Sequence, residues 1–430
     1  MGDTAKNFGA LRSRDLIVWA LAGATMLVAP QVFGSSLAVT MLSQMGIAIV
    51  ACLSFNMLLG QGGMLSFGHA VYSGLGSFVT IHALQAIGSG GLPIPVGTIP
   101  LVGGLAGLLF AALFGFVSTR KSGTTFAMIT LGIGELVFAA SLMVPEFFGG
   151  EAGVNANRVV GKAVMGITFG PQIQVYYLLA FYTFVCTAGM YAFTRTPLGR
   201  MLNAVRDNPE RVGFIGYDTQ RVRYVSFVIA GFFAGVAGGM YALNFEIATA
   251  EVVGAARSGA YLLFTFLGGV TFFVGPIIGA VLMVVALVML SEITKAWLLY
   301  LGLAFLLMVM YAPGGIASLI MVNLRVCKFG KFGPLLGGYA ALAAAGAPML
   351  FGGAAMVEMV YHLQLNEALG PTMRFLGIGL DVKAAASWLG TAMVAAIGSV
   401  LFEFARRRFV LRWGQVQNEI EAAIRAKESV

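Results

Sequence analysis

Long apolar runs, each about as long as a membrane-crossing helix, follow one another along almost all of this 430-residue chain. A helix needs about 20 apolar residues to cross the roughly 30 Å hydrocarbon layer of a bilayer. Only 10% of the residues are charged, against roughly 25% in a soluble domain, so the chain cannot coat a water-soluble globule. The sequence therefore predicts an all-α polytopic membrane helix bundle with twelve spans, at 16–34, 37–59, 64–87, 99–118, 124–144, 173–194, 224–245, 256–273, 275–291, 296–312, 333–360 and 384–405.

The first apolar run, 16–34, follows Lys6, Arg12 and Arg14, a pattern that also introduces cleaved signal peptides. The run is long, and no small-x-small cleavage site follows its core. We therefore interpret it as a retained first span.

The lysine and arginine residues orient the predicted spans, because cytoplasmic loops carry an excess of both. With the N-terminus in the cytoplasm and the spans alternating, most of the 26 basic residues fall inside. The opposite side keeps Arg158, Lys162, Arg257, Lys295, Arg374 and Lys383. A span count wrong by one would scramble this asymmetry, so both termini are predicted to be cytoplasmic.

The composition also excludes several classes of function. A formal net charge of +8 suits nucleic-acid binding, but the basic residues lie between apolar runs rather than on one exposed domain. Cys52, Cys186 and Cys327 form neither a disulfide framework nor a metal-ligand spacing. The three histidines have no convergent catalytic partners, and no GxxxxGK[ST] phosphate-binding loop occurs. We expect no nucleic-acid partner, metal, cofactor or enzymatic activity in this chain.

The segment 195–223 is the long polar connection between two strong spans on the predicted inside. Thr196 and Asn208 are each followed by proline, the signal of an N-cap before the first helical position. They predict two short helices, at 197–206 and 209–215. Spacings of three and four align four apolar residues of the first helix: Leu198, Met201, Leu202 and Val205. Such a unit suits docking into a groove on a partner protein or lying on anionic lipid.

Four sequence blocks stand in a fixed order along the chain. They are LLGQGGMLSFGHAVYSGLGSF at 58–78, TTFAMITLGIGELV at 124–137, GR with AVRDNPERV and SFVIAGFFAGVAGGMYAL between 199 and 243, and YAPGGI at 311–316. Each block alone is a weak signal. In this order they resemble the permeases of branched-chain amino acid ABC transporters, over about residues 10–320.

The resemblance implies a type II importer permease fold of about ten core spans, with the coupling loop 195–223 between spans six and seven. It assigns coupling to an ATPase to nine residues: Gly199, Arg200, Ala204, Arg206, Asp207, Asn208, Pro209, Glu210 and Arg211. It also implies two cytoplasmic ABC ATPase subunits, a related second permease subunit, a periplasmic solute-binding protein and a bacterial inner membrane.

Residues 321–430 exceed the usual length of that family. They are predicted to form an extra two-helix membrane hairpin, separate from a permease domain at 1–320, with a basic amphipathic tail. In the tail Val416, Ile420 and Ile424 stand four apart and form one apolar stripe. That stripe suits an amphipathic helix that lies on lipid or on a partner protein. The alternative is a frayed tail without a stable helix.

Polar residues inside the spans are candidates for a substrate pathway, because polar groups at membrane depth are costly. Asn56, Gln61, Ser66 and His69 lie in a glycine-rich break, which is tolerated only when buried in protein or lining a wet cavity. A plain cytoplasmic turn, with His69 as a hydrogen-bonded structural residue, is the alternative.

Thr130 and Glu135 lie in the predicted span 124–144 and complete the candidate pathway set. Glu135 is interpreted as a pathway carboxylate, as a group that locks helices by a hydrogen bond, or as the buried partner of a basic residue on another span. Other glycines recur four apart on helix faces and predict close helix packing: Gly103 with Gly107, Gly231 with Gly235 and Gly239, and Gly275 with Gly279.

The favoured function is ATP-driven import of branched-chain amino acids or similar small solutes by alternating access, as the resemblance implies. The resemblance leaves the solute open among branched-chain amino acids, urea, amides and aromatic acids, and leaves open whether the second permease is a copy or a relative. The alternative is a 12-span secondary transporter driven by an ion gradient. Against it, the inside loop near residue 60 lacks the charged turn of the major facilitator family, and no aspartate lies inside the spans.

Overall fold

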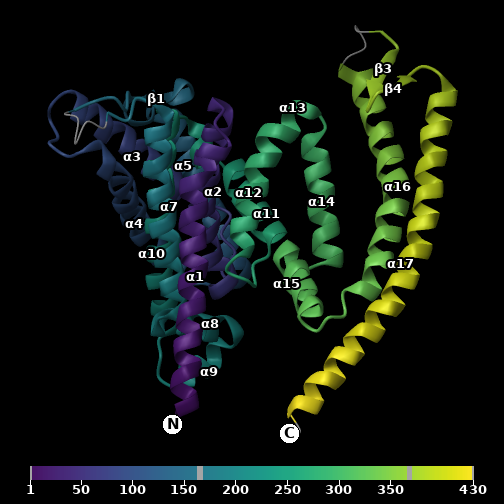
Figure 1. Ribbon diagram of the computed structural model, residues 1–430. Coiled ribbons are helices and arrows are strands. Elements are labelled where there is room, and N and C mark those ends of the chain that lie inside the picture. The colour runs from purple at the N-terminus through teal and green to yellow at the C-terminus, as the bar shows by residue number, and fades with distance from the viewer. Residues whose placement is uncertain (1, 162–167, 366–369, 429–430) are drawn as a thin grey trace. The chain divides into compact units, whose positions relative to one another are not determined.

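The computed structural model describes residues 2–161, 168–365 and 370–428, and almost all of its regular structure is α-helical (Figure 1). Lys162, one of the basic residues predicted to lie outside, is not among the described residues. The helices are α1 Gly2–Val32, α2 Ser36–Asn56, α3 Ala70–Gly88, α4 Ile99–Ser118, α5 Gly123–Met143, α6 Pro145–Phe148, α7 Gln172–Arg195, α8 Pro197–Asp207, α9 Pro209–Phe214, α10 Thr219–Phe245, α11 Ala255–Gly268, α12 Gly275–Val285, α13 Ser291–Ile293, α14 Trp297–Tyr311, α15 Gly315–Lys328, α16 Gly333–Leu365 and α17 Ala385–Glu428. The short strands are β1 Val154–Asn155, β2 Ile247–Ala248, β3 Thr372–Phe375 and β4 Ile378–Asp381.

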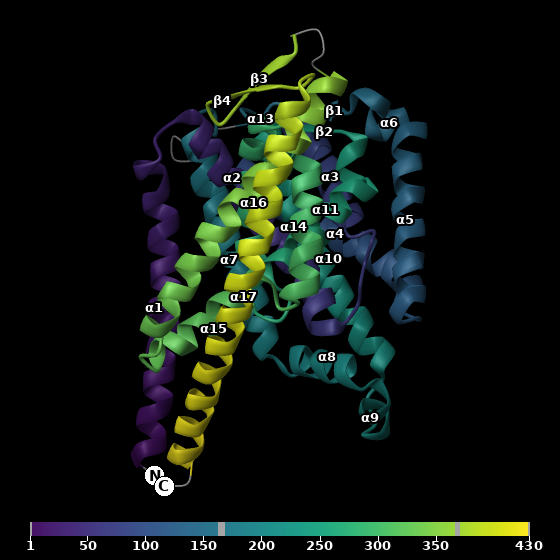
Figure 2. The same ribbon diagram turned by 90° about the vertical axis from the view of Figure 1, so that its right-hand side faces the viewer.

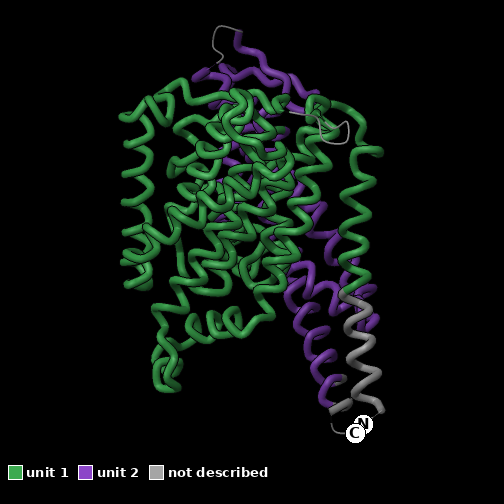
Figure 3. Tube along the Cα trace, turned by 90° about the vertical axis from the view of Figure 1, so that its left-hand side faces the viewer, with its two compact units in different colours: residues 1–288, 308–317 green, residues 289–307, 318–430 purple. Residues whose placement is uncertain are grey.

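The chain divides into two compact units (Figure 3). The core unit contains residues 1–288 and 308–317, and the extension unit contains residues 289–307 and 318–430. Helices α1 to α12 belong to the core unit, and α13, α16 and α17 belong to the extension unit. The boundary passes through α14 and α15.

Among the described residues, nine helices are long and apolar enough to cross a membrane, and the bent pair of α14 and α15 makes a tenth span if counted as one. This confirms the predicted polytopic helix bundle, but the described residues hold nine or ten such helices rather than the predicted twelve. The apolar part of α1 is a shorter stretch, Leu16–Val32.

The predicted span at 256–273 corresponds to α11, whose 14 residues reach only about 21 Å at 1.5 Å per residue. It is too short to cross the hydrocarbon layer by itself. The helix ends at Gly269, whose φ of 114° is a backbone conformation that glycine adopts without strain. Helix α12 then packs back on α11, with Gly279 lying against the carbonyl of Phe264.

Helices α4 and α10 cross at the predicted glycine faces. A Cβ atom on Gly235 would lie 2.8 Å from the Cα of Gly107, and one on Gly103 would lie 2.7 Å from the carbonyl oxygen of Gly235. Gly231 and Gly239 extend the same face of α10 against α4. The prediction of backbone-to-backbone packing is confirmed here, and a side chain at these positions has no room.

A two-stranded ribbon closes the end of the core unit that lies opposite α8 and α9 (Figure 2). Strand β1 pairs antiparallel with β2, and the Glu246 carboxylate before β2 accepts a 2.7 Å bond from the Arg158 amide. The Arg158 guanidinium also donates to the Phe169 carbonyl at 2.9 Å and to Gln172 at 3.1 Å. Arg158, predicted only as an outside charge, therefore holds this loop together.

In the extension unit, α16 and α17 form an antiparallel hairpin joined by β3 and β4. The two strands flank a turn in which Leu376 and Gly377 both have positive φ, 47° and 85°, the geometry of a type I′ hairpin. We did not predict these strands. Helices α16 and α17 approach closely at Gly352 and Gly398. An added Cβ on Gly352 would lie 2.6 Å from the backbone of α17, and one on Gly398 would clash with the backbone at Met349 of α16.

The predicted apolar stripe of the tail packs inside the extension unit rather than on lipid or a partner. Val416 and Ile420 are 6% and 2% exposed, and they pack with Val326 of α15 and Leu335 of α16. A 2.8 Å ion pair joins Lys331 to Glu419 beside this cluster. The apolar stripe is therefore buried by contacts within the chain.

The glycine face gives a first prediction. Replacing Gly235 by alanine forces α4 and α10 apart, which costs about 1–3 kcal/mol, so the protein should lose thermal stability in detergent. The matched control is Gly259→Ala on α11, where an added Cβ meets nothing within 4 Å and the helix gains about 0.5–1 kcal/mol. Melting followed by fluorescence size-exclusion chromatography compares the two. Equal melting temperatures for both variants would contradict the packing.

Candidate functional site

The two helices predicted in the polar loop 195–223 are present as α8 and α9. The Thr196 hydroxyl accepts the Gly199 amide at 3.2 Å, and the Asn208 side chain accepts the Arg211 amide at 3.0 Å. Each cap precedes a proline at the first helical position, as the sequence predicts. Figures 1 and 2 show α8 and α9 at the same end of the core unit as the start of α1.

Two residues of the apolar stripe of α8 are buried within the chain. Leu202 is fully buried and Val205 is 4% exposed. A Cβ atom on Gly62 would lie 3.2 Å from the Leu202 side chain, so the stripe packs on the glycine-rich segment after α2. Leu198 and Met201 are partly exposed. The chain's own packing therefore uses two of the four stripe residues, and docking of the other two on a partner or on lipid stays a prediction.

Arg206 ties α8 to the same segment. Its Nη1 donates to the carbonyl oxygen of Gly60, and its Nε donates to Asp207 at 2.9 Å. Its aliphatic stem lies against Gly63, where an added Cβ would lie 2.8 Å from the Arg206 Cγ. The loop and the break in the membrane helices are therefore one connected structure.

The other residues assigned to coupling are partly buried in the protein and partly exposed. Gly199 is buried against the carbonyl of Phe193, which leaves no room for a side chain. Ala204 and Asn208 are partly buried. The exposed members are Arg200, Asp207, Pro209, Glu210 and Arg211.

An exposed apolar tip follows α9, and we did not single it out from the sequence. Phe214, Ile215 and Tyr217 are 87%, 67% and 52% exposed. The tip lies on the polar loop, outside the long apolar helices. Large apolar side chains on a polar loop mark an interaction surface. The signal in the sequence was three large apolar residues within four positions at the end of the second short helix.

The polar break, residues 56–69, joins α2 to α3 and gathers the other candidates. A π-helical turn, Met57–Gln61, ends α2, and residues 63–66 are not helical before α3 begins at Ala70. Asn56 and Ser66 are buried, at 3% and 0% exposure. Asn56 Oδ1, Gln61 Oε1 and Ser66 Oγ are buried without a hydrogen-bond partner in the described structure. Unpaired buried polar atoms are costly and need an explanation.

His69 has a more ordinary environment. Its Nε2 lies 2.9 Å from the Ser54 hydroxyl, and its ring meets the rings of Phe55 and Tyr72 edge-on. It is fully buried, and only Nδ1 lacks a partner. This geometry favours the structural interpretation of His69 over a pathway role.

Thr130 fastens α5 to the polar break. Its hydroxyl accepts the Phe67 amide at 3.1 Å and donates to the Ala127 carbonyl at 2.9 Å. Gly68 lies directly against the Thr130 carbonyl, so only glycine fits there. The structure thus brings Thr130 of α5 into contact with the polar break.

The surroundings of Glu135 contradict two of its three interpretations, the helix-locking hydrogen bond and the buried ion pair, and leave the pathway carboxylate as a prediction. Glu135 is exposed on α5, and no hydrogen bond or ion pair to it occurs among the described residues, so it is not a buried partner of a basic residue. At 1.5 Å per residue it lies about 12 Å from the Met143 end of α5 and about 18 Å from the Gly123 end. A carboxylate therefore stands deep in an apolar helix, on the surface of the core unit.

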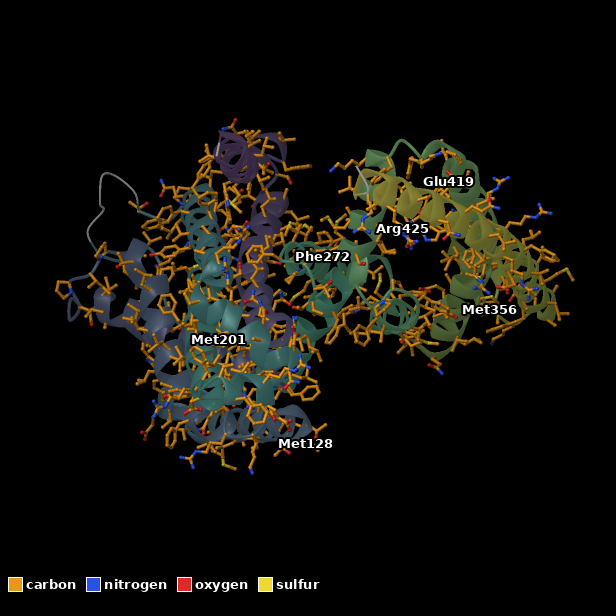
Figure 4. The ribbon with its side chains drawn as sticks, turned by 90° about the horizontal axis from the view of Figure 1, so that it is seen from below. Met128, Met201, Phe272, Met356, Glu419 and Arg425 are labelled. Atoms are coloured by element: carbon orange, nitrogen blue, oxygen red, sulfur yellow. The ribbon has the colours of Figure 1, made fainter. Side chains whose placement is uncertain are left out.

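Glu135 belongs to a continuous exposed line on α5, with spacings of three and four residues. We call it the α5 stripe: Thr125, Met128, Gly132, Glu135, Ala139 and Leu142. An added Cβ on Gly132 meets nothing within 4 Å. Figure 4 places Met128 at the edge of the core unit. The stripe mixes small, apolar and charged residues, unlike a surface that meets only lipid.

A small cavity of about 120 Å³ lies between α2, α10, α11 and α12 in the core unit. Arg257 lies over the Tyr241 ring at 5.3 Å, and Gln44 and Tyr261 complete its polar lining. These donors suit a carboxylate. From the sequence Arg257 was only an outside charge, because spacing does not show which helices meet.

Within the described ranges, no group of three or more His, Cys, Asp or Glu side chains could hold a metal ion. The arrangement instead offers hydrogen-bonding and charged groups along membrane helices, which suits movement of a polar solute.

Comparison with known proteins agrees with this picture. The sequence model of the family described as "Branched-chain amino acid transport system / permease component" matches residues 37–313. The high-affinity branched-chain amino acid transport system permease protein LivM of Escherichia coli is 25% identical over 307 residues, 65% of this chain and 70% of LivM. The LivM protein of Salmonella typhimurium is 26% identical over 304 residues, with the same coverage.

A more distant relative is the probable branched-chain amino acid transport permease protein LivH of Methanocaldococcus jannaschii. It is 25% identical over 219 residues, 50% of this chain and 67% of LivH. No solved structure matches the chain significantly.

The unpaired polar atoms of the break give a second prediction. If the break lines a wet pathway, a cysteine at Ser66 should react with a charged methanethiosulfonate reagent, and a transported solute should slow the reaction. The control is Ser141→Cys on α5, equally buried but with its hydroxyl bonded to the Phe138 carbonyl at 2.6 Å. Both are made after replacing Cys52, Cys186 and Cys327. Equal labelling rates would contradict a pathway at the break.

Proposed function

Because the chain belongs to the family of branched-chain amino acid transport permease components, we propose that it is the permease subunit of an ATP-driven importer for branched-chain amino acids or similar small solutes. The names of its relatives in Escherichia coli and Salmonella typhimurium support this solute class. The proposed location is a bacterial inner membrane, with both termini in the cytoplasm.

The proposed complex contains two cytoplasmic ABC ATPase subunits, a related second permease subunit and a periplasmic solute-binding protein. ATP hydrolysis belongs to the ATPase subunits, and this chain carries the solute by alternating access. The apolar tip is the proposed contact with an ATPase, because exposed aromatic and aliphatic residues on a polar loop suit a hydrophobic groove. The neighbouring Glu210 and Arg211 supply the polar rim of that contact.

The link from α8 to the polar break is the observation that carries the proposal. Leu202 packs on Gly62, and Arg206 donates to the Gly60 carbonyl. Interiors this closely packed transmit displacement rather than absorb it. A force on the apolar tip therefore reaches the end of α2 through α8, and the unpaired atoms of Asn56, Gln61 and Ser66 gain hydrogen-bond partners when the break moves.

The α5 stripe is the proposed face toward the second permease subunit. An exposed carboxylate at the centre of a helix costs roughly 2.5–3.5 kcal/mol when it faces lipid, so Glu135 requires a polar neighbour or water. A pathway between two permease subunits supplies both. In that pathway Glu135 complements the ammonium group of an amino acid, and Thr130 and the polar break lie on the inner side of the same helix.

The coupling proposal is tested by two variants that act on different steps. Phe214→Asp with Ile215→Asp removes the apolar tip and should weaken ATPase binding at least ~10-fold, about 1.4 kcal/mol. Arg206→Gln leaves the tip intact, so ATPase should still bind while uptake per ATP hydrolysed falls. Co-purification with the ATPase, ATPase rate and uptake in vesicles are measured together.

The control for the tip is Gln220→Asp, which adds an acidic group to the same loop at an exposed position outside the tip. It should leave ATPase binding unchanged. Normal binding in the tip variant, or full uptake in Arg206→Gln, would remove the corresponding step from the mechanism.

The proposed role of Glu135 predicts that Glu135→Gln lowers uptake of a zwitterionic amino acid at least ~10-fold, about 1.4 kcal/mol in the activation free energy. The amide keeps the size of the side chain but loses the charge that attracts the ammonium group. Glu135→Asp should retain part of the uptake. Glu146→Gln, at an exposed position on α6, is the charge-matched control and should transport normally. Wild-type uptake by Glu135→Gln would refute this role.

A further inference from the structure

A groove of about 850 Å³ lies between α16 and α17 in the extension unit. Its α16 wall consists of glycine and alanine, including Gly337 and Ala341. Its α17 wall is apolar at one end, at Leu401 and Phe404. At the other end it carries two cations, Arg408 and Arg412, with Phe409 and Leu411 between them. Leu401 and Phe404 are 50% and 64% exposed, so the groove is open along its apolar part.

The length of α17 sets the depth of these residues in a bilayer. The helix begins at Ala385, beside Trp388, whose indole donates to the Val382 carbonyl at 2.9 Å. At 1.5 Å per residue, Phe404 lies about 29 Å along the helix and Arg408 about 35 Å. The hydrocarbon layer is roughly 30 Å thick. If α17 enters the layer near Ala385, Phe404 lies at its far boundary and Arg408 lies among the headgroups.

The charges near the groove are unequally neutralised. Glu403 accepts from Arg406 at 2.7 Å and from Arg407 at 2.8 Å. Arg408 and Arg412 line the groove instead, and within the part of the chain that the structure describes no ion pair involves either of them. The next acidic residue along the helix, Glu419, pairs with Lys331. Two guanidinium groups therefore face the groove with no acidic neighbour.

From this arrangement we infer that the α16–α17 groove binds an anionic phospholipid. One acyl chain lies along the glycine and alanine wall beside Leu401 and Phe404. The phosphate lies between Arg408 and Arg412, which stand four residues apart and so share a helix face. Planar guanidinium groups suit phosphate oxygens, and basic pockets between membrane helices at the cytoplasmic side suit anionic headgroups.

Other occupants fit less well. A free anion would use the two arginines but would leave the apolar part of the groove empty. A helix of another subunit would fill the apolar part, but it would bury two cations at a cost of several kcal/mol per ion unless it brought its own acidic groups. An amphiphile with a negative head satisfies both halves without any added acidic group. This inference does not depend on which solute the core unit carries.

The test uses the purified full chain in detergent, with dioleoyl phosphatidylglycerol as probe and dioleoyl phosphatidylcholine as the zwitterionic comparison. Native mass spectrometry counts bound lipid, and thermal melting measures its stabilisation. Wild type should retain phosphatidylglycerol in preference to phosphatidylcholine. Arg408→Gln with Arg412→Gln should weaken phosphatidylglycerol binding about 10- to 30-fold, since each arginine near the surface contributes about 1 kcal/mol.

Matched variants separate the groove from general surface charge. Arg406→Gln with Arg407→Gln removes the same net charge from neighbouring residues of α17. It should change binding less than about 3-fold, because these arginines do not line the groove and both pair with Glu403. Ala341→Trp fills the groove and should displace the lipid with both groove arginines present. Ala343→Trp, exposed on α16 but not in the groove, should bind lipid as wild type does.

Four outcomes would overturn the inference. Equal losses in the two arginine pairs would mean that only the overall charge matters. Unchanged binding in Ala341→Trp, or displacement of the lipid by inorganic phosphate, would indicate a plain anion site. If Arg408→Gln with Arg412→Gln abolished binding of a protein subunit but left phosphatidylglycerol binding unchanged, the groove would belong to that subunit.

Discussion

The contact between α8 and the polar break is the interaction on which the rest of the core unit depends. Arg206 donates to the Gly60 carbonyl, and Leu202 packs on Gly62. Both contacts exist because the break carries glycines where side chains would separate the two segments. Thr130 and Gly68 bring α5 to the same break. One glycine-rich segment therefore joins an exposed loop, the end of α2 and the helix that carries Glu135.

The sequence predicted what depends on local chemistry. Thr196 and Asn208 cap α8 and α9 because a cap and a following proline act within one turn. Most of the membrane helices follow from the length of their apolar runs. Gly107 and Gly235 meet as predicted, because small residues four apart leave a helix face that only another backbone can approach.

The remaining features depend on long-range contacts, which a pattern along the chain does not contain. Helical spacing shows that Leu202 faces an apolar surface, but not whether that surface is a partner or the same chain. Glu135 has the same local sequence whether it is buried or exposed. Helix α11 is short because Gly269 reverses the chain there, although the apolar run continues. The Arg257 cavity needs four helices that are far apart in sequence.

A direct measurement of the proposed mechanism is uptake into proteoliposomes that contain this chain with its second permease, ATPase subunits and binding protein. If α8 and α9 transmit the work of an ATPase, amino-acid uptake should require ATP on the side of the membrane that carries these helices. It should also continue after ionophores collapse the proton and sodium gradients. Uptake that follows an ion gradient without ATP or ATPase subunits would contradict the mechanism and identify a secondary transporter.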